Sequence, residues 1–176
     1  MRHMKFGAAI VIALTLFAGA ATAQKKTVKK PVTKKPPITK TVVPPLDVRV
    51  AREKVDTQLA NVNRFVDVLG PIAQAIETLD ASNAVKKLPP ETVAKNEANK
   101  TKVIEAIRNL KAGLATLESE FRTKASLAKY LPSIQGITDL AAQSEDSAIA
   151  GKFVAAKEPL RDVAKKLTDT LAAMPL

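Results

Sequence analysis

The sequence predicts an all-α fold: an antiparallel, up-down four-helix bundle, preceded by a signal peptide and a disordered tail rich in lysine and proline. Two observations lead to this prediction. Apolar residues recur at intervals of three and four over long stretches after Asp47, which is the periodicity of amphipathic helices. Hydrophobic residues make up 46% of the chain but aromatic residues only 3%, and this aliphatic composition favours helices packed on helices over sheets.

Residues 1–23 have the three parts of a secretory signal peptide. A basic start precedes an apolar run over 6–17, and small residues precede a cleavage site expected between Ala23 and Gln24. The alternative is an uncleaved membrane anchor, because the four lysines just after the apolar stretch oppose translocation. That stretch, 6–21, has 16 residues, whereas a spanning helix needs roughly 20. We therefore expect an exported protein, either periplasmic or secreted.

Residues 24–46 form a basic linker that contains seven lysines, five prolines and no acidic residue. The prolines interrupt helices and the like charges repel one another, so we expect this linker to be disordered. The chain from Asp47 onward carries only +2 of the net charge of +11. The linker predicts either a solubilising spacer or a tether to an anionic partner. The tether would consist of Lys25, Lys26, Lys29, Lys30, Lys34, Lys35 and Lys40.

The bundle domain, 47–176, is expected to contain four helices, which span about 48–87, 91–122, 124–143 and 147–174. Pro89 and Pro90 separate the first two helices, and the polar cluster 144–147 is expected to cap the fourth. Pro71 should kink the first helix, while Pro132 and Pro159 should bend the third and fourth. The alternative is a three-helix bundle in which 123–145 is only a covering segment.

Each predicted helix has an apolar side that the bundle should bury. Leu110 and Leu114 lie in the middle of this side on the second helix. The first two helices are joined near Leu88, and antiparallel packing about this point brings Asp80 close to Glu97. We expect Lys100 to neutralise Asp80 or Glu77 in a polar cap. The expected core of the first helix is Val55, Leu59, Val62, Val66, Leu69, Ala73 and Ile76, widened by Phe65, Val68, Ile72 and Leu79.

The sequence lacks the residue types on which many catalytic and metal sites depend. It contains no cysteine, and its one histidine, His3, lies in the leader, which argues against thiolate, imidazole and most zinc chemistry. Glu118, Glu120, Glu145 and Asp146 are interpreted as solvated surface residues. We therefore expect a non-enzymatic protein with no catalytic residue, cofactor or metal.

Three classes of function fit these features. The favoured class is an interaction or structural module whose linker binds an anionic envelope polymer or a membrane surface, with a protein partner on the bundle. The second is a nonspecific nucleic-acid-binding protein, because the composition of 25–37 resembles the Lys-Lys-Pro tails of linker histones, and lysines bind phosphates by counterion release. The third is an all-α enzyme that works by electrostatics, by analogy with secreted chorismate mutases, in which Arg, Lys and Glu line a helical pocket. Arg49, Arg52 and Arg64 on the first helix are the candidates for such a pocket, although their spacing matches no complete motif.

Overall fold

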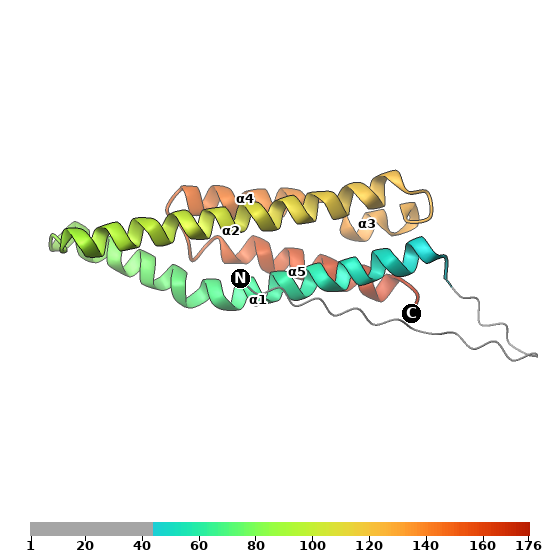
Figure 1. The fold of residues 1–176 in the computed structure, drawn as a ribbon, viewed down its shortest axis with the longest axis horizontal. Helices are drawn as coiled ribbons and strands as arrows, with labels where there is room; N and C mark the ends of the chain where they lie inside the picture. Colours follow the sequence, from blue (N-terminus) through green and yellow to red (C-terminus); the bar gives the residue numbers. More distant parts are fainter. Residues whose placement is uncertain (1–43) are drawn as a thin grey trace, which may run out of the picture. The chain divides into compact units, whose positions relative to one another are not determined.

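The computed structural model describes residues 44–176, in which every regular element is a helix. The four main helices are α1 (Leu46–Val85), α2 (Pro90–Thr123), α4 (Ile137–Ile149) and α5 (Lys157–Ala173) (Figure 1). A 3-10 helix (Ala128–Tyr130) and the single-turn α3 (Leu131–Ile134) connect α2 to α4. The all-α class is confirmed for this part of the chain. The predicted signal peptide, and the predicted linker as far as residue 43, lie outside the described residues.

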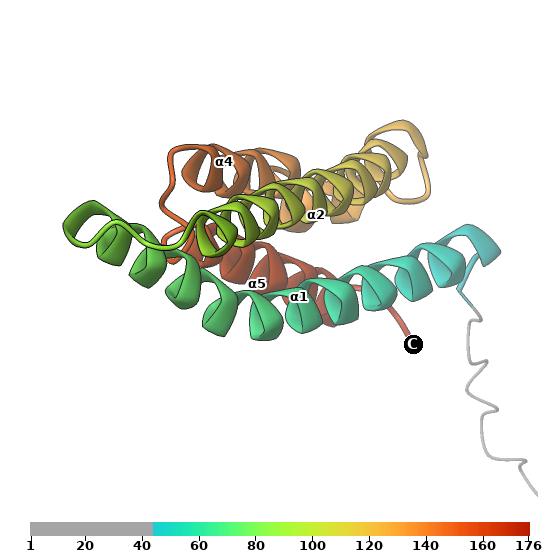
Figure 2. The same ribbon diagram turned by 60° about the vertical axis from the view of Figure 1, so that its left-hand side comes forward.

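The four main helices run up and down beside one another (Figures 1 and 2). α1 packs against α2 and α5, and α4 packs against the same two helices. Two hydrogen bonds show that α1 and α5 are antiparallel: Arg52, early in α1, reaches Leu171 at the end of α5, and Glu77, late in α1, reaches Val154 just before α5 begins. Because α4 contacts both α2 and α5, it is a full member of the bundle rather than a covering segment.

The core is aliphatic and contains most of the residues expected from the helical spacing. On α2, Leu114 is fully buried as expected, whereas Leu110 is half-buried; the other buried apolar residues of this helix are Val103, Ile107, Leu117 and Phe121. On α1, however, Val68 is 53% and Ile72 is 37% exposed. The buried side of α1 is therefore narrower than the sequence indicated. The largest fully buried side chains include Phe121, Phe153, Leu69, Ile76, Ile107 and Leu114.

The predicted start of the last helix, at residue 147, is wrong. α4 continues through the polar cluster 144–147, and α5 begins only after a further turn. α4 ends in a Schellman motif: Gly151 has a φ of 76° and its amide bonds the carbonyl of Ala148 at 3.0 Å, while the amide of Lys152 bonds the carbonyl of Ser147 at 2.9 Å. Only glycine adopts this left-handed conformation without a steric cost. Gly151, rather than the polar cluster, marks the helix boundary.

The predicted helix 124–143 is also wrong, because Gly136 divides it. Gly136 has a φ of 88° and lies between α3 and α4. Pro132 is the second residue of α3, and Pro159 is the third residue of α5. Amides in the first turn of a helix have no intrahelical partner, so a proline there removes no helical hydrogen bond. These two prolines therefore lie at helix starts and do not interrupt helices, contrary to the expectation.

α1 and α2 form a hairpin that is longer than α4 and α5. α1 continues through Pro71 as one helix, and its ribbon bends in the middle part that contains this proline (Figures 1 and 2). The closed end of the hairpin projects past the connection between α4 and α5 (Figure 1). No residue between Ile76 and Asn96 is buried. This end is therefore supported mainly by contacts between α1 and α2.

Candidate functional site

The residues assigned to the predicted tether lie outside the described part of the chain. The cleavage-site residues Ala23 and Gln24, and the seven lysines from Lys25 to Lys40, all precede residue 44. Within 44–176, the features that could bind a ligand or take part in chemistry are carboxylates held between helices, polar groups at helix ends and several surface hollows, of which three are described below.

Glu118, on α2, is a buried carboxylate that caps the start of α4. It accepts hydrogen bonds from the amides of Gly136 and Thr138, both at 3.1 Å, and from the Thr138 hydroxyl at 2.8 Å. Arg122 adds an ion pair at 2.9 Å. Burial opposes ionisation, but these hydrogen bonds outweigh it and hold the pKa of Glu118 below its usual value. Glu118 thus supplies acceptors for the unpaired amides of a helix start.

Glu145 lies on α4, near its end, and its side chain binds basic residues of α2. Its carboxylate accepts hydrogen bonds from Lys111 and from Arg108, the latter at 2.5 Å, while only 7% of the residue is exposed. The hydrogen bond from Lys111, followed by that from Arg108, lowers the pKa of Glu145. Together with Glu118 at the start of α4, Glu145 fixes this helix against α2 at both ends.

The interpretation of these two carboxylates as solvated is wrong. Glu118 lies four residues after Leu114, so the helical spacing places both on one side of α2. Glu145 lies between Ala141 and Ala148, which mark the buried side of α4. This spacing could have identified Glu118 as a buried residue from the sequence alone. Glu145 could be identified as buried only once the polar cluster around it was known to be helical.

The predicted polar cap between α1 and α2 is confirmed. The ammonium group of Lys100 lies 2.7 Å from a carboxylate oxygen of Asp80 and 2.7 Å from one of Glu97. The side-chain amide of Asn96 donates a hydrogen bond to Asp80 at 2.8 Å. Desolvation opposes the charge of Lys100, but the hydrogen bonds to the two carboxylates outweigh it and raise the pKa of this lysine. A short connection between the two helices was sufficient to predict this register.

The three arginines of α1 that suggested an electrostatic pocket do not have the same environment. Arg52 donates hydrogen bonds to the carbonyls of Leu171 at 2.6 Å and Met174 at 2.9 Å. The last carbonyls of a helix lack intrahelical partners and carry partial negative charge, so Arg52 caps the end of α5. Arg49 and Arg64 are exposed.

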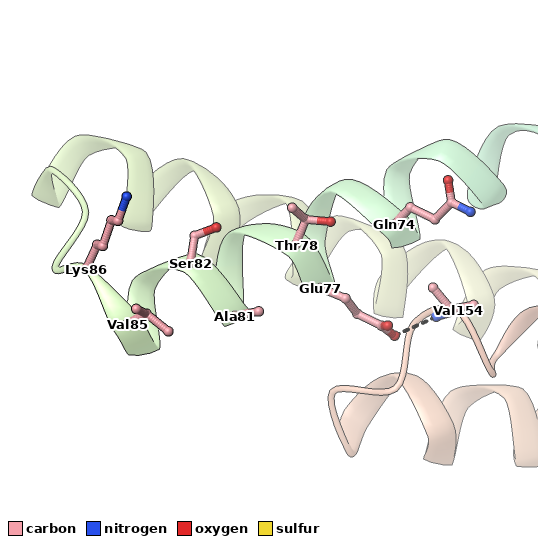
Figure 3. A pocket seen from close by; sticks show the side chains of 8 residues that line it. All are labelled: Gln74, Glu77, Thr78, Ala81, Ser82, Val85, Lys86 and Val154. Carbon is pink, nitrogen blue, oxygen red and sulfur yellow. Dashed lines mark hydrogen bonds between the residues drawn. The ribbon is translucent and has the colours of Figure 1, made fainter.

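The first surface hollow, the hairpin-end groove, has a volume of about 620 Å³ and follows the last turns of α1 (Figure 3). Glu77, the other predicted partner of Lys100, instead accepts a hydrogen bond here from the amide of Val154 at 2.8 Å. This bond ties the segment before α5 to α1. Further along the groove are Ser82 and the exposed Val85.

The second hollow, the interhelix groove, has a volume of about 550 Å³ and lies between α1 and α2. A Cβ atom added to Gly113 would lie 3.1 Å from Nε2 of Gln58, so this glycine marks a close approach of the two helices. An ion pair between Lys54 and Glu120 joins the helices beside the groove. The hydrogen bond from Lys54 is the main cause of a lowered pKa at Glu120, and Lys124 adds to it.

The third hollow, the tail-end hollow, has a volume of about 490 Å³ and lies where α1 begins. Tyr130 lines this hollow and is buried, with 6% of its surface exposed. The ammonium group of Lys129 lies 4.8 Å from the centroid of the Tyr130 ring, which is cation–π geometry. The other lining residues include Pro44, Pro45, Val48, Ser126 and Pro175.

Neither a metal-binding cluster nor a membrane-spanning helix is found within residues 44–176. This range contains no group of three or more histidine, cysteine, aspartate or glutamate residues that could hold a metal ion. None of its helices combines the length and hydropathy required to cross a membrane. Comparison with protein-family models, curated proteins and solved structures finds no significant match.

Proposed function

We propose that the protein is an exported, non-enzymatic helical bundle, an interaction or structural module held near an anionic component of the cell envelope by its basic linker. The observation that carries this proposal is the uneven distribution of charge. Residues 24–46 contain seven lysines and no acid, whereas the chain from Asp47 onward contributes only +2 of the net +11. Such a segment attracts polyanions within a Debye length, about 10 Å at 0.1 M salt.

The partners of the buried and half-buried carboxylates support a structural role for the bundle. Glu118 and Glu145 join α2 to α4, and Glu120 pairs with Lys54 of α1. Each of these carboxylates has a lowered pKa whose cause is a partner within the fold. The shifted pKa values are therefore explained by helix packing.

The proposal is tested with the full chain from Gln24 onward. One variant replaces the seven linker lysines by glutamine, which removes the charge but keeps the length, the prolines and the bundle. Binding is measured to anionic lipid vesicles, lipopolysaccharide, peptidoglycan and DNA at low and high salt. We expect weak, salt-sensitive binding to an envelope polyanion and its loss in the glutamine variant.

A matched control replaces exposed lysines that are spread over the bundle, namely Lys86, Lys87, Lys102, Lys152 and Lys165. It should bind almost as well as the unmodified chain, because it leaves the lysine cluster intact. If the linker variant binds as well as the unmodified chain, the linker is a spacer and the bundle carries recognition. If no anionic probe is bound, the tether does not exist.

Nucleic acid is the second candidate partner, on the composition of 25–37. The linker has no aromatic residue on which a base could stack, so binding would depend on phosphate contacts and not on sequence. DNA binding that exceeds binding to every envelope probe, together with an intact chain in the cytoplasm, would favour this candidate.

A further inference from the structure

The polar cap between α1 and α2 contains a buried acceptor that has no donor. Asn96, on α2, is 4% exposed. Its side-chain nitrogen donates hydrogen bonds to a carboxylate oxygen of Asp80 at 2.8 Å and to the carbonyl of Ile76 at 3.4 Å. Its side-chain oxygen, Oδ1, is buried and has no hydrogen-bond partner among residues 44–176. Buried polar atoms in folded proteins are almost always hydrogen-bonded to protein or to water, so this oxygen indicates a bound donor.

The orientation of the Asn96 amide follows from its neighbours. The two groups that its nitrogen meets, the carboxylate of Asp80 and the carbonyl of Ile76, can only accept hydrogen bonds. Turning the amide over would place Oδ1 against a negatively charged carboxylate and remove both hydrogen bonds. The nitrogen therefore faces these acceptors, and Oδ1 takes the other position of the amide.

The protein donor to consider first is Lys100, one turn after Asn96 on α2. Its ammonium group lies 2.7 Å from carboxylate oxygens of both Asp80 and Glu97. Hydrogen bonds between charged groups are stronger than those to a neutral amide oxygen, so a move of the ammonium group towards Oδ1 would weaken the stronger interactions. Lys100 is therefore held by the carboxylates.

A small cavity adjoins Asn96 and supplies the space for a donor. It has a volume of about 20 Å³, and its lining includes Thr92, Val93 and Asn96 of α2 and Asn83 next to the end of α1. One water molecule needs a cavity of about 10–15 Å³ and two to four polar partners, whereas pockets for organic ligands have about 300 Å³ or more. The size therefore selects water.

Thr92 is the second partner that the helix geometry offers. It lies four residues before Asn96, so the two side chains are neighbours on one face of α2, and both line the cavity. A hydroxyl group can donate one hydrogen bond and accept others. It can therefore bond a water molecule whose own proton is donated to Oδ1.

We infer that this cavity binds one water molecule, which donates a hydrogen bond to Oδ1 of Asn96 and also bonds the hydroxyl of Thr92. The water completes the polar cap, because the Asn96 side chain then has a partner on both its nitrogen and its oxygen. This hydration site belongs to the bundle and does not depend on the proposed function.

A monovalent cation is the competing occupant, because Asp80 and Glu97 also line the cavity. The ammonium group of Lys100 already pairs with both carboxylates. A second positive charge beside it would be repelled, whereas a neutral water molecule would not.

The first measurement is a crystal structure of the full chain from Gln24 onward. It should show a water oxygen about 2.5–3.0 Å from Oδ1 of Asn96. A direct hydrogen bond to Oδ1 from Lys100 or from another side chain would overturn the inference. A cation coordinated by Oδ1 would overturn it as well.

The second measurement is cross-relaxation in solution between water and the side-chain amide protons of Asn96, observed by NMR in the rotating frame, where its sign distinguishes it from proton exchange. The unmodified chain should give this signal. Val93→Ile adds a methylene group to a residue that lines the cavity, and Thr92→Val removes the hydroxyl at nearly constant size. Each variant should lose at least half of the signal.

The matched control is Val85→Ile, which adds the same methylene group at a residue that is 83% exposed. It should keep the full signal, and circular dichroism checks that all three variants are folded. An equal signal in the control and in both cavity variants would overturn the inference. A water seen in the crystal without a signal in solution would identify a water bound in the crystal only, and would overturn it too.

Discussion

The carboxylate of Glu118 accepts three hydrogen bonds at the start of α4, one from Gly136 just before the helix and two from Thr138. Glu118→Gln keeps the size of the side chain but replaces one acceptor oxygen with an NH2 group that faces the donors of Gly136 or Thr138. We expect the free energy of unfolding to decrease by about 1–3 kcal/mol, because buried amides lose their acceptor. Urea denaturation followed by circular dichroism measures this loss.

The matched control is Glu158→Gln on α5. Glu158 and Arg161 form an ion pair at 2.8 Å, but their side chains are 63% and 55% exposed. An exposed pair contributes about 0–1 kcal/mol, so this variant should be almost as stable as the unmodified protein. Equal losses in the two variants would contradict the assignment of Glu118 as the cap of α4.

Acid should destabilise the fold by protonating the glutamates whose pKa values are lowered in the folded state. The folded-state pKa values of Glu118, Glu120 and Glu145 lie below the ordinary value of 4.5. A depressed pKa contributes stability that is fully present above the unfolded-state pKa and is lost as the pH falls through the folded-state pKa. We therefore expect the free energy of unfolding to fall as the pH decreases below about 4.5, and to fall less steeply in Glu118→Gln. Urea titrations over this pH range measure both profiles, and an unchanged slope in the variant would contradict the prediction.

At the scale of the helix, α2 presents one buried side on which Leu114 and Leu110 lie one turn apart. Leu114 has no exposed surface, whereas Leu110 is half-buried. Leu114→Ala should reduce the free energy of unfolding by about 2–5 kcal/mol, and Leu110→Ala by less, because its side chain loses fewer contacts. Thermal and urea unfolding measure both. Two variants as stable as the unmodified protein would mean that this side of α2 is not core.

The sequence was sufficient to predict those elements that are determined by residues close together in the chain. The long spacing patterns of α1 and α2 predicted both helices, and the short connection between them predicted the contact of Lys100 with Asp80. The boundaries of α4 were missed because its polar residues resemble a helix cap, although Gly136 and Gly151 could have indicated them. The cap of α4 by Glu118 could not be predicted, because its partners lie 18 and 20 residues away and depend on how α4 folds back on α2.

Across the whole molecule, burial is unevenly distributed along the α1–α2 hairpin. The closed end of the hairpin extends past the connection between α4 and α5 (Figure 1), and no residue between Ile76 and Asn96 is buried. Local opening of this end exposes little apolar surface and should require little free energy. We expect the amides of 78–95 to exchange with deuterium faster than those around Leu114, although both regions are helical. Exchange followed by mass spectrometry measures the difference, and equal protection would contradict it.

Lys100 is one of the residues that join α1 to α2 near the hairpin end, because its ammonium group lies 2.7 Å from carboxylates of both helices. Lys100→Met keeps the apolar stem but removes the charge. Exchange within 78–95 should then accelerate by up to about fivefold, which corresponds to roughly 1 kcal/mol for a partly exposed ion pair, while exchange around Leu114 changes little. Lys95→Met is the matched control, since the side chain of Lys95 is 73% exposed in its own ion pair, and it should leave both regions unchanged. Acceleration around Leu114 as large as that in the hairpin end would show that the polar cap supports the whole bundle and not this end alone.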